Sequence, residues 1–350
     1  MKIQFVIEKK NHLFKSFILL KELQKDEEIA CSLIKILNQN LIPYRNYLEK
    51  LELKPDYSEI RIKNKTLLAN FSELINKTEK IMNKEKPDIV VLFGNCNSSL
   101  AAAITASKLN IKIAHLDAGL RSSFKNKKFK NINRKIIDHL STILFPPTRT
   151  AFNNLVKEGL EKKSHLTGDL TYDTLIYYKN LLLENQETLT NTISLPDKFY
   201  LTYLNKPINI TNDNRLKKIV QTLSELNLPV IFICPKKLTK KSIHLNLKNV
   251  IILDPLDYPT MISCIMKSEK VLTDSSNLLK EAYILKKPTI TLFEETLYIE
   301  TLHNNWNFVT DVDPQKIIFA LNQNQKSRSQ KRIFGRGSTA ESIATKLKRS

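Results

Sequence analysis

The chain has 350 residues, of which 42% are hydrophobic and 26% are charged, and its formal net charge is +20. These values are typical of a globular chain with two domains, and no apolar run reaches the roughly 18 residues of a membrane-spanning helix. The charge comes from lysines spread through a Lys-, Asn- and Ile-rich sequence that has no helix-turn-helix, zinc-finger or RNP-like motif. We therefore expect no membrane contact and no sequence-specific nucleic-acid binding, and affinity for anionic sugars or nucleotides is the milder interpretation.

The four cysteines are scattered along the chain without paired spacing, at positions 31, 96, 234 and 264. This pattern predicts neither a disulfide nor a metal site. The apolar part of residues 1–7 is too short for a signal peptide and is typical of a first buried strand. We therefore expect a reducing, cytoplasmic location.

The first half of the chain predicts alternating strands and helices. The apolar run Ile89–Phe93 indicates a strand buried on both faces of a parallel sheet, and Gly94 ends it. Ser98 and Ser99 are candidate caps for the helix that follows, and Lys112–Leu116 is the next strand, which completes a βαβ unit. We further predict a strand over 2–7 and helices over 27–41, 63–84, 100–109 and 149–158.

The second half begins after a polar stretch, residues 180–198, which we interpret as a domain hinge. Three apolar runs then predict buried strands over 199–204, 230–234 and 250–253. The sequence Val271-Leu272-Thr273-Asp274-Ser275 predicts another strand, followed by a helix that begins near Ser275.

Short motifs at the strand ends occur in a characteristic order. The strand before Gly94 ends in Gly94-Asn95, the next ends in His115-Leu116-Asp117-Ala118-Gly119-Leu120-Arg121, and Asn133-Arg134 follows. This order resembles the non-hydrolysing UDP-N-acetylglucosamine 2-epimerases, whose corresponding motifs are Gly-Asp-Thr-Thr, His-Val-Glu-Ala-Gly-Leu-Arg and Pro-Glu-Glu-x-Asn-Arg. Five of the six glycines in the chain fall on family motifs, and the resemblance covers nearly the whole sequence.

The resemblance implies an α/β fold with two Rossmann-like domains facing a central cleft, which is the GT-B-like architecture. We expect an N-terminal domain over 1–180, a UDP-binding domain over 198–335, and a C-terminal helix over 336–350 that packs back on the first domain. The resemblance also implies a homodimer formed through the first domain. No cofactor is expected. None of the predicted strands is followed by the Gly-x-Gly-x-x-Gly motif that would indicate a nicotinamide cofactor, and the family reaction implies no metal.

The family reaction eliminates UDP from the sugar and adds it back with C2 inverted, which requires groups that remove and return a proton. The three family acids fall on Asn95, Asp117 and Asn131, and an amide cannot accept a proton near neutral pH. Asp117 is therefore the one predicted catalytic residue, and it is one methylene shorter than the family's Glu. The family's catalytic His is missing, with Asn205 as the nearest residue.

The groups that contact the nucleotide are better preserved. Lys10 and Lys15 fall in the family's first turn, Ser275 can bind phosphate at a helix N-terminus, and Glu281 suits a ribose hydroxyl. Met261 occupies the position of an apolar residue near uracil. The resemblance thus implies these substrate-binding residues: Lys10, Lys15, Asn95, Asn131, Asn205, Met261, Ser275 and Glu281.

These substitutions favour a UDP-sugar-binding protein of nucleotide-sugar or surface-polysaccharide metabolism, with UDP-N-acetylglucosamine as the first ligand and standard epimerisation impaired. One alternative is a non-catalytic binding or regulatory paralogue. Another is a GT-B-type glycosyltransferase, with His12 as its base.

Overall fold

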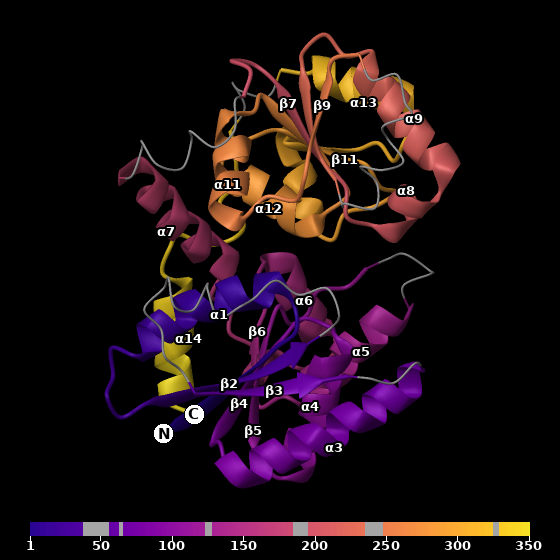
Figure 1. The fold of residues 1–350 in the computed structure, drawn as a ribbon. Helices are drawn as coiled ribbons and strands as arrows, with labels where there is room; N and C mark the ends of the chain where they lie inside the picture. The colour runs from indigo at the N-terminus through magenta and orange to yellow at the C-terminus, as the bar shows by residue number, and fades with distance from the viewer. Residues whose placement is uncertain (38–55, 63–65, 123–127, 185–194, 235–247, 325–328) are drawn as a thin grey trace. The chain divides into compact units, whose positions relative to one another are not determined.

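The computed structural model describes residues 1–37, 56–62, 66–122, 128–184, 195–234, 248–324 and 329–350 (Figure 1). The chain divides into two compact units. Unit 1 comprises Met1–Thr174 and Ile333–Ser350, and unit 2 comprises Leu175–Arg332. Within the ranges described, no helix is both long and apolar enough to cross a membrane.

Unit 1 is built on a six-stranded parallel sheet with the strand order β3-β2-β1-β4-β5-β6. Its strands are β1 (Lys2–Ile7), β2 (Ala30–Leu37), β3 (Asp56–Arg61), β4 (Ile89–Phe93), β5 (Lys112–Leu116) and β6 (Ile143–Phe145). Its helices are α1 (Lys10–Leu23), α3 (Leu67–Glu85), α4 (Asn97–Lys108), α5 (Lys128–Leu140), α6 (Arg149–Lys157), the 3₁₀ turn η2 (Glu161–Lys163) and α14 (Thr339–Lys348).

Helices cover both faces of this sheet, as the continuous apolar run of β4 predicts. Val90 and Leu92 pack in one cluster with buried residues of α3, α4 and α5. On the other face, α1 and α14 lie side by side (Figure 1). Since β4 is buried on both sides, all five of its residues are apolar.

Unit 2 contains a second six-stranded parallel sheet, with the order β12-β11-β10-β7-β8-β9. Its strands are β7 (Tyr200–Tyr203), β8 (Val230–Ile233), β9 (Val250–Leu253), β10 (Lys270–Thr273), β11 (Thr289–Thr291) and β12 (Asn307–Val309). The helices α8 (Pro207–Thr211), α9 (Asp213–Ser224) and α13 (Pro314–Asn322) lie on one face, and α11 (Tyr258–Lys267) and α12 (Ser276–Ile284) on the other (Figure 1). The 3₁₀ segment η3 (Ile299–Asn305) precedes β12.

Both sheets follow the same doubly wound order, since two further strands lie on each side of a central pair that begins the unit's two halves. That central pair is β1 and β4 in unit 1, and β7 and β10 in unit 2. The chain direction across the sheet reverses there, and open α/β sheets bind ligands at the carboxyl ends of such a pair. The expected α/β fold with two Rossmann-like units is confirmed, and the topology directs attention to these strand ends.

Two predictions about local structure are wrong. Residues 27–41 were expected to form a helix, but Ala30–Leu37 is strand β2, paired on both sides with β1 and β3. Ile34 and Ile36 pack in one cluster while Leu33 is buried on the other side of the alternation, so burial on both faces produces an apolar run that imitates a helix face.

The second wrong prediction concerns the caps of α4. The helix begins at Asn97 after Cys96, so Ser98 and Ser99 lie inside its first turn. The Ser98 hydroxyl bonds Glu8 and the Ser99 hydroxyl donates to the Phe93 carbonyl at 2.8 Å, so both hydroxyls join α4 to strand ends.

The helix α7 (Leu170–Glu184) begins in unit 1 and continues into unit 2. It therefore covers the first residues of the predicted hinge over 180–198, and residues 185–194 of that hinge lie outside the described residues. The final helix, α14, belongs to unit 1, where it contacts α1.

Candidate functional site

A buried lysine joins the loops at the carboxyl end of the unit 1 sheet. The Lys15 ammonium lies 2.6 Å from Asp117 Oδ1 and 2.9 Å from Asp169 Oδ1. The side chains of Lys15, Asp117 and Asp169 are 4%, 13% and 0% exposed, so Asp117 is the most accessible of the three. The structure thus brings together the predicted Lys15 and Asp117, and adds Asp169, which sequence analysis did not assign to the site.

Asp117 follows β5 in a left-handed backbone conformation, with φ of 62°. Asp is one of the few residues that adopt this conformation at modest cost, and such outliers concentrate at functional sites. Two residues later, Gly119 also has a positive φ, 72°, and a Cβ there would lie 2.2 Å from the Ala151 carbonyl oxygen. The loop after β5 therefore turns sharply where it passes against α6.

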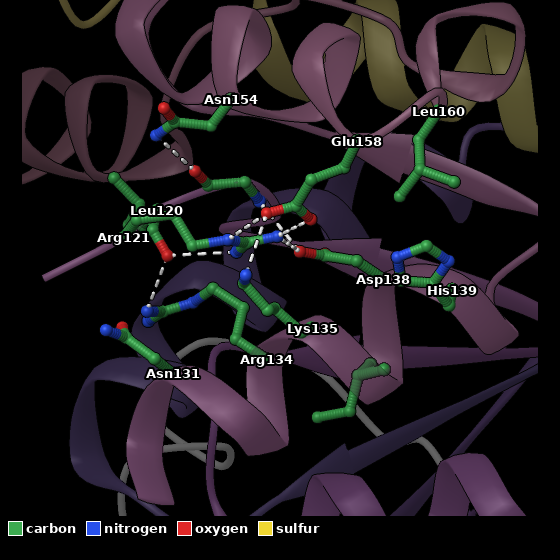
Figure 2. Close-up of polar contacts among 12 residues, drawn as sticks. Leu120, Arg121, Asn131, Arg134, Lys135, Asp138, His139, Asn154, Glu158 and Leu160 are labelled. Carbon is green, nitrogen blue, oxygen red and sulfur yellow. Dashed lines mark hydrogen bonds and ion pairs between the residues drawn. The ribbon is translucent and has the colours of Figure 1, made fainter. Parts of the chain in front are cut away.

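An ionic network connects this loop to α5 and to the end of α6 (Figure 2). Asp138 of α5 accepts the Gly119 N–H at 3.2 Å and the Arg121 guanidinium at 2.7 Å. Arg121 also binds both carboxylate oxygens of Glu158, at 3.0 and 2.6 Å, so its guanidinium lies between the two acids in Figure 2. Burial raises the pKa of Asp138, but the neighbouring charges of His115 and Arg121 outweigh it and hold that pKa below its ordinary value.

His115 of β5 completes the network. Its Nδ1 lies 2.7 Å from Asp138 Oδ1 and its Nε2 lies 2.7 Å from the Gly94 carbonyl oxygen. The fully buried ring therefore ties the end of β4 to α5.

The two asparagines at family acid positions make backbone contacts. The Asn131 amide donates to the Ser122 carbonyl at 2.6 Å and accepts the Ser122 N–H at 3.0 Å. The Asn95 carbonyl accepts from the Asn133 amide at 3.3 Å, and the same amide donates to Asn97 at 2.9 Å. Asn131 is therefore engaged in holding the loop after Arg121.

Lys10 and His12 lie on α1, where the family resemblance implied a turn. The Lys10 ammonium is 5.9 Å from the ring centroid of Phe14. His12 is buried and stacks on Phe93 with ring centroids 5.2 Å apart. Burial, reinforced by the charge of Lys9, lowers the pKa of His12 to about 3, so the ring is neutral.

In unit 2, Asp274 links the ends of the central strands β7 and β10. Its carboxylate accepts the backbone N–H groups of Asn205 and Lys206, at 2.7 and 3.1 Å, and the Asn209 amide at 2.9 Å. The Lys206 ammonium donates to the Asp274 carbonyl at 2.6 Å and lies 3.6 Å from the ring centroid of Phe293. Asn205 is exposed beside this buried carboxylate, at the predicted strand end.

Ser275 begins α12 as its N-cap, and its hydroxyl accepts the Leu278 N–H. Neither Ser276 nor Asn277 has a positive φ, so both residues enter the helix without left-handed strain. Ser275 and Asn205 thus lie at neighbouring strand ends, joined through Asp274. The N-terminus of α12 presents backbone N–H groups that suit an anion.

The remaining unit 2 predictions lie on helices. Glu281 is on α12 and is 9% exposed, and Met261 is on α11, packed against the core that includes Leu278. Beside Glu281, Lys280 is almost fully buried, and its ammonium lies 5.3 Å from the ring centroid of Tyr298. Lys280 is thus a buried cation next to the predicted ribose contact.

Four residues of these two sites were not predicted from the sequence. They are His115, Asp138, Asp169 and Lys280. His115 stands in one of the motifs that carry the resemblance, which was a usable signal. Among the described side chains, no group of three or more His, Cys, Asp or Glu could hold a metal ion.

Comparison with known proteins agrees with this topology. The family model described as UDP-N-acetylglucosamine 2-epimerase matches residues 21–348. A UDP-N-acetylglucosamine 2-epimerase homolog of Methanococcus maripaludis is 34% identical over 311 residues, which cover 86% of this chain and 87% of that protein. A UDP-2,3-diacetamido-2,3-dideoxy-D-glucuronate 2-epimerase of Pseudomonas aeruginosa is 32% identical, with 86% of each chain covered.

Solved structures give the same result. The Methanocaldococcus jannaschii UDP-GlcNAc 2-epimerase, crystallised in complex with UDP-GlcNAc and UDP, is 31% identical and aligns over the whole of both chains with a TM-score of 0.88. Sequence similarity across most of the chain and an equivalent fold lead to one conclusion. The chain belongs to the UDP-N-acetylglucosamine 2-epimerase family.

Proposed function

We propose that this protein binds a UDP-sugar, with UDP-N-acetylglucosamine as the first ligand to test, and that its standard epimerisation is impaired. The proposal for binding is supported by family membership and by the relative that was crystallised with UDP-GlcNAc and UDP. The proposal for impaired catalysis is supported by the side chains at the three family acid positions.

Asn131 is the observation that carries the second part. Its Nδ2 donates to the Ser122 carbonyl while its Oδ1 accepts the Ser122 N–H. A carboxylate could not make the first bond, because an ionised acid only accepts hydrogen bonds. This position is therefore adapted to an amide with a structural role. With Asn95 also an amide, Asp117 is the single carboxylate at the three positions, and its shorter side chain retracts the charge from the Glu position.

The groups of unit 2 are proposed to hold the nucleotide. The N-terminus of α12 with Ser275 would receive a phosphate, Glu281 a ribose hydroxyl, and Met261 the base. Lys206 lies at the strand end that carries Asp274, and Lys280 lies on α12 next to Glu281; both add positive charge, which favours a pyrophosphate. Asn205 would offer an exposed amide where the family has its histidine.

The glycosyltransferase alternative is disfavoured by the position of His12. That interpretation required an accessible base, but the ring is buried against Phe93 and its pKa is lowered to about 3. A base with so low a pKa is nearly ineffective at neutral pH, since catalytic bases work best when their pKa lies near the working pH. Dimerisation through the first domain and a cytoplasmic location stay predictions of the resemblance.

The deciding experiment is incubation with UDP-N-acetylglucosamine in D₂O, followed by NMR at C2, alongside a thermal-shift titration with the same ligand. We expect saturable stabilisation by the ligand and deuterium uptake at least about 10²-fold slower than in the M. jannaschii relative, because one misplaced acid alone can cost that much. Asp117→Asn should abolish any uptake and retain binding.

Each part of the proposal can fail separately. Uptake as fast as in the relative would refute the impairment, and the absence of a thermal shift at saturating ligand would refute binding. Binding without any uptake would identify the non-catalytic paralogue. Transfer of the sugar to an acceptor, abolished by replacing His12, would identify the glycosyltransferase.

A further inference from the structure

Lys15 is a buried cation with two acidic partners, and the geometry distinguishes the two partners. Both contacts are short, 2.6 Å to Asp117 and 2.9 Å to Asp169, and the three side chains together carry one net negative charge. Removing a charge from its partner inside a protein is expensive, because an ion left unpaired in a low-dielectric interior keeps its full desolvation penalty. The number of acids beside the lysine therefore determines which of them can be neutralised.

With one acid, the pair would resist protonation. If Asp117 alone balanced Lys15, each proton that it accepted would leave a buried ammonium without a counterion. With Asp169 present, the same protonation leaves Lys15 and Asp169 as a neutral pair. The second acid also repels the first, and a like charge at this range raises the proton affinity of a carboxylate.

The surroundings assign the permanent role to Asp169. It is fully buried, and its Oδ1 accepts the Thr171 N–H at 2.8 Å at the start of α7, where the helix dipole favours negative charge. Its backbone N–H also donates to the Phe334 carbonyl at 2.9 Å, which fixes the residue against the C-terminal segment. Asp117 has the more exposed side chain of the pair and lies on the loop after β5.

We propose that Asp169 is the permanent counterion of Lys15, so that Asp117 can accept and release a proton. Asp169 is thus a positioning residue, which acts on Asp117 through Lys15 and does not touch the ligand. In this chain a carboxylate at 169 partly offsets the carboxylates missing at 95 and 131. The proton-accepting role of Asp117 toward a sugar rests on the proposed function, whereas its response to Asp169 does not.

Two other titratable groups lie near Asp117. His12 on α1 interacts electrostatically with Asp117 but is neutral, since burial lowers the pKa of His12 to about 3. On the α5 side, Asp138 is engaged by His115, Arg121 and the Gly119 N–H. Lys15 pairs directly with the carboxylate of Asp117 at 2.6 Å, and Asp169 contacts the same ammonium at 2.9 Å.

The test is an NMR titration of protein labelled with ¹³C at the aspartate carboxyl carbons, without ligand, with Asp117 assigned from Asp117→Asn. We compare the unsubstituted protein with Asp169→Asn, which keeps an oxygen for the Thr171 N–H and removes only the charge. The titration midpoint of Asp117 should fall by about one to three pH units, which is roughly a ten- to thousandfold loss of proton affinity, since Lys15 then acts on Asp117 alone.

Glu22→Gln is the matched control. It removes one negative charge from the same helix about two turns beyond Lys15, where Glu22 pairs with the exposed Lys25, and should leave the midpoint unchanged. Asp169→Ser repeats the test with another capping residue if Asp169→Asn does not fold. An unchanged or raised midpoint in the folded variant overturns the proposal.

This outcome is independent of ligand binding. If the midpoint shifts as expected but UDP-N-acetylglucosamine neither binds nor exchanges at C2, the proposed function fails and the role of Asp169 stands. If the ligand binds and exchanges at C2 while the titration midpoint of Asp117 does not move, the proposed role of Asp169 fails and ligand binding stands.

Discussion

His12 provides a test of burial at the scale of one residue. Its pKa falls from 6.5 in the unfolded chain to about 3 in the folded protein, because the ring is fully buried and lies near Lys9. Below pH 6.5 the unfolded chain therefore binds a proton at His12, whereas the folded protein keeps this ring neutral. Stability should be lost as pH falls through this window, by up to about 1.4 kcal/mol per pH unit from this residue.

Replacing the ring should remove that slope. We expect His12→Asn to show a flatter pH dependence of the free energy of unfolding, measured in urea between about pH 7 and 5. His139→Asn, at an exposed position of α5, is the control and should retain the original slope. Equal slopes in both variants would show that His12 is not kept neutral by burial.

Individual site residues differed in how far the sequence could predict them. Lys15 and Asp117 were expected to be functional, and the structure joins them by an ion pair of 2.6 Å. Asp169 escaped notice because its meaning depends on the lysine that it faces, and that pairing spans more than 150 positions of sequence. Asn131 was expected to contact substrate, but its bonds to Ser122 depend on the path of a loop that no local pattern specifies.

At the scale of elements, the loop after β5 depends on Gly119, which packs against α6. A Cβ at this position would meet the Ala151 carbonyl oxygen at 2.2 Å and Leu155 Cγ at 2.8 Å, and the backbone φ is +72°. Gly119→Ala should therefore combine left-handed strain, about 1–2 kcal/mol, with the further cost, roughly 1–3 kcal/mol, of forcing α6 away. Because the same loop carries Asp117, ligand binding should weaken as well.

Gly94 offers the matched comparison for this prediction. Its φ is +63°, but a Cβ there would have no heavy atom within 4 Å. Gly94→Ala should cost only the strain, and the difference between the two variants in urea unfolding isolates the contact with α6. Equal losses in the two variants would contradict this interpretation.

The elements themselves were predictable where one cue was unambiguous. The βαβ unit from β4 to β5 was expected because β4 is short, wholly apolar and ended by a glycine. β2 was misassigned as a helix because residues 29–37 carry apolar side chains at both helical and strand spacings. Its true state is decided by hydrogen bonds to β1 and β3, which lie outside the segment.

At the scale of the molecule, the last 18 residues in the numbering, 333–350, complete unit 1. Phe334, Ile343 and Leu347 are each no more than 1% exposed, and α14 packs on α1. Asp173 also accepts the Thr339 N–H at 3.0 Å. Ending the chain after Arg332 should destabilise unit 1 by several kcal/mol, since each large apolar side chain contributes about 1.5–3 kcal/mol on burial.

Unit 2 should be spared, because its two core clusters contain no residue of 333–350. Calorimetry of the truncated chain should therefore show a low-temperature transition for unit 1 and a retained transition for unit 2. A chain ending at Lys348 keeps α14 and should behave like the full chain. Simultaneous loss of both transitions would show that the units do not unfold separately.

The return of α14 to unit 1 also has a consequence for biosynthesis. A ribosome synthesises the whole of 175–332, the sequence of unit 2, before it synthesises α14, the helix that completes unit 1. Domains usually fold in the order in which they are synthesised, starting from the N-terminus. Here the nascent unit 1 must wait, with the α1 surface uncovered, while unit 2 already has all its residues, so the second unit in the sequence is the first that can finish folding.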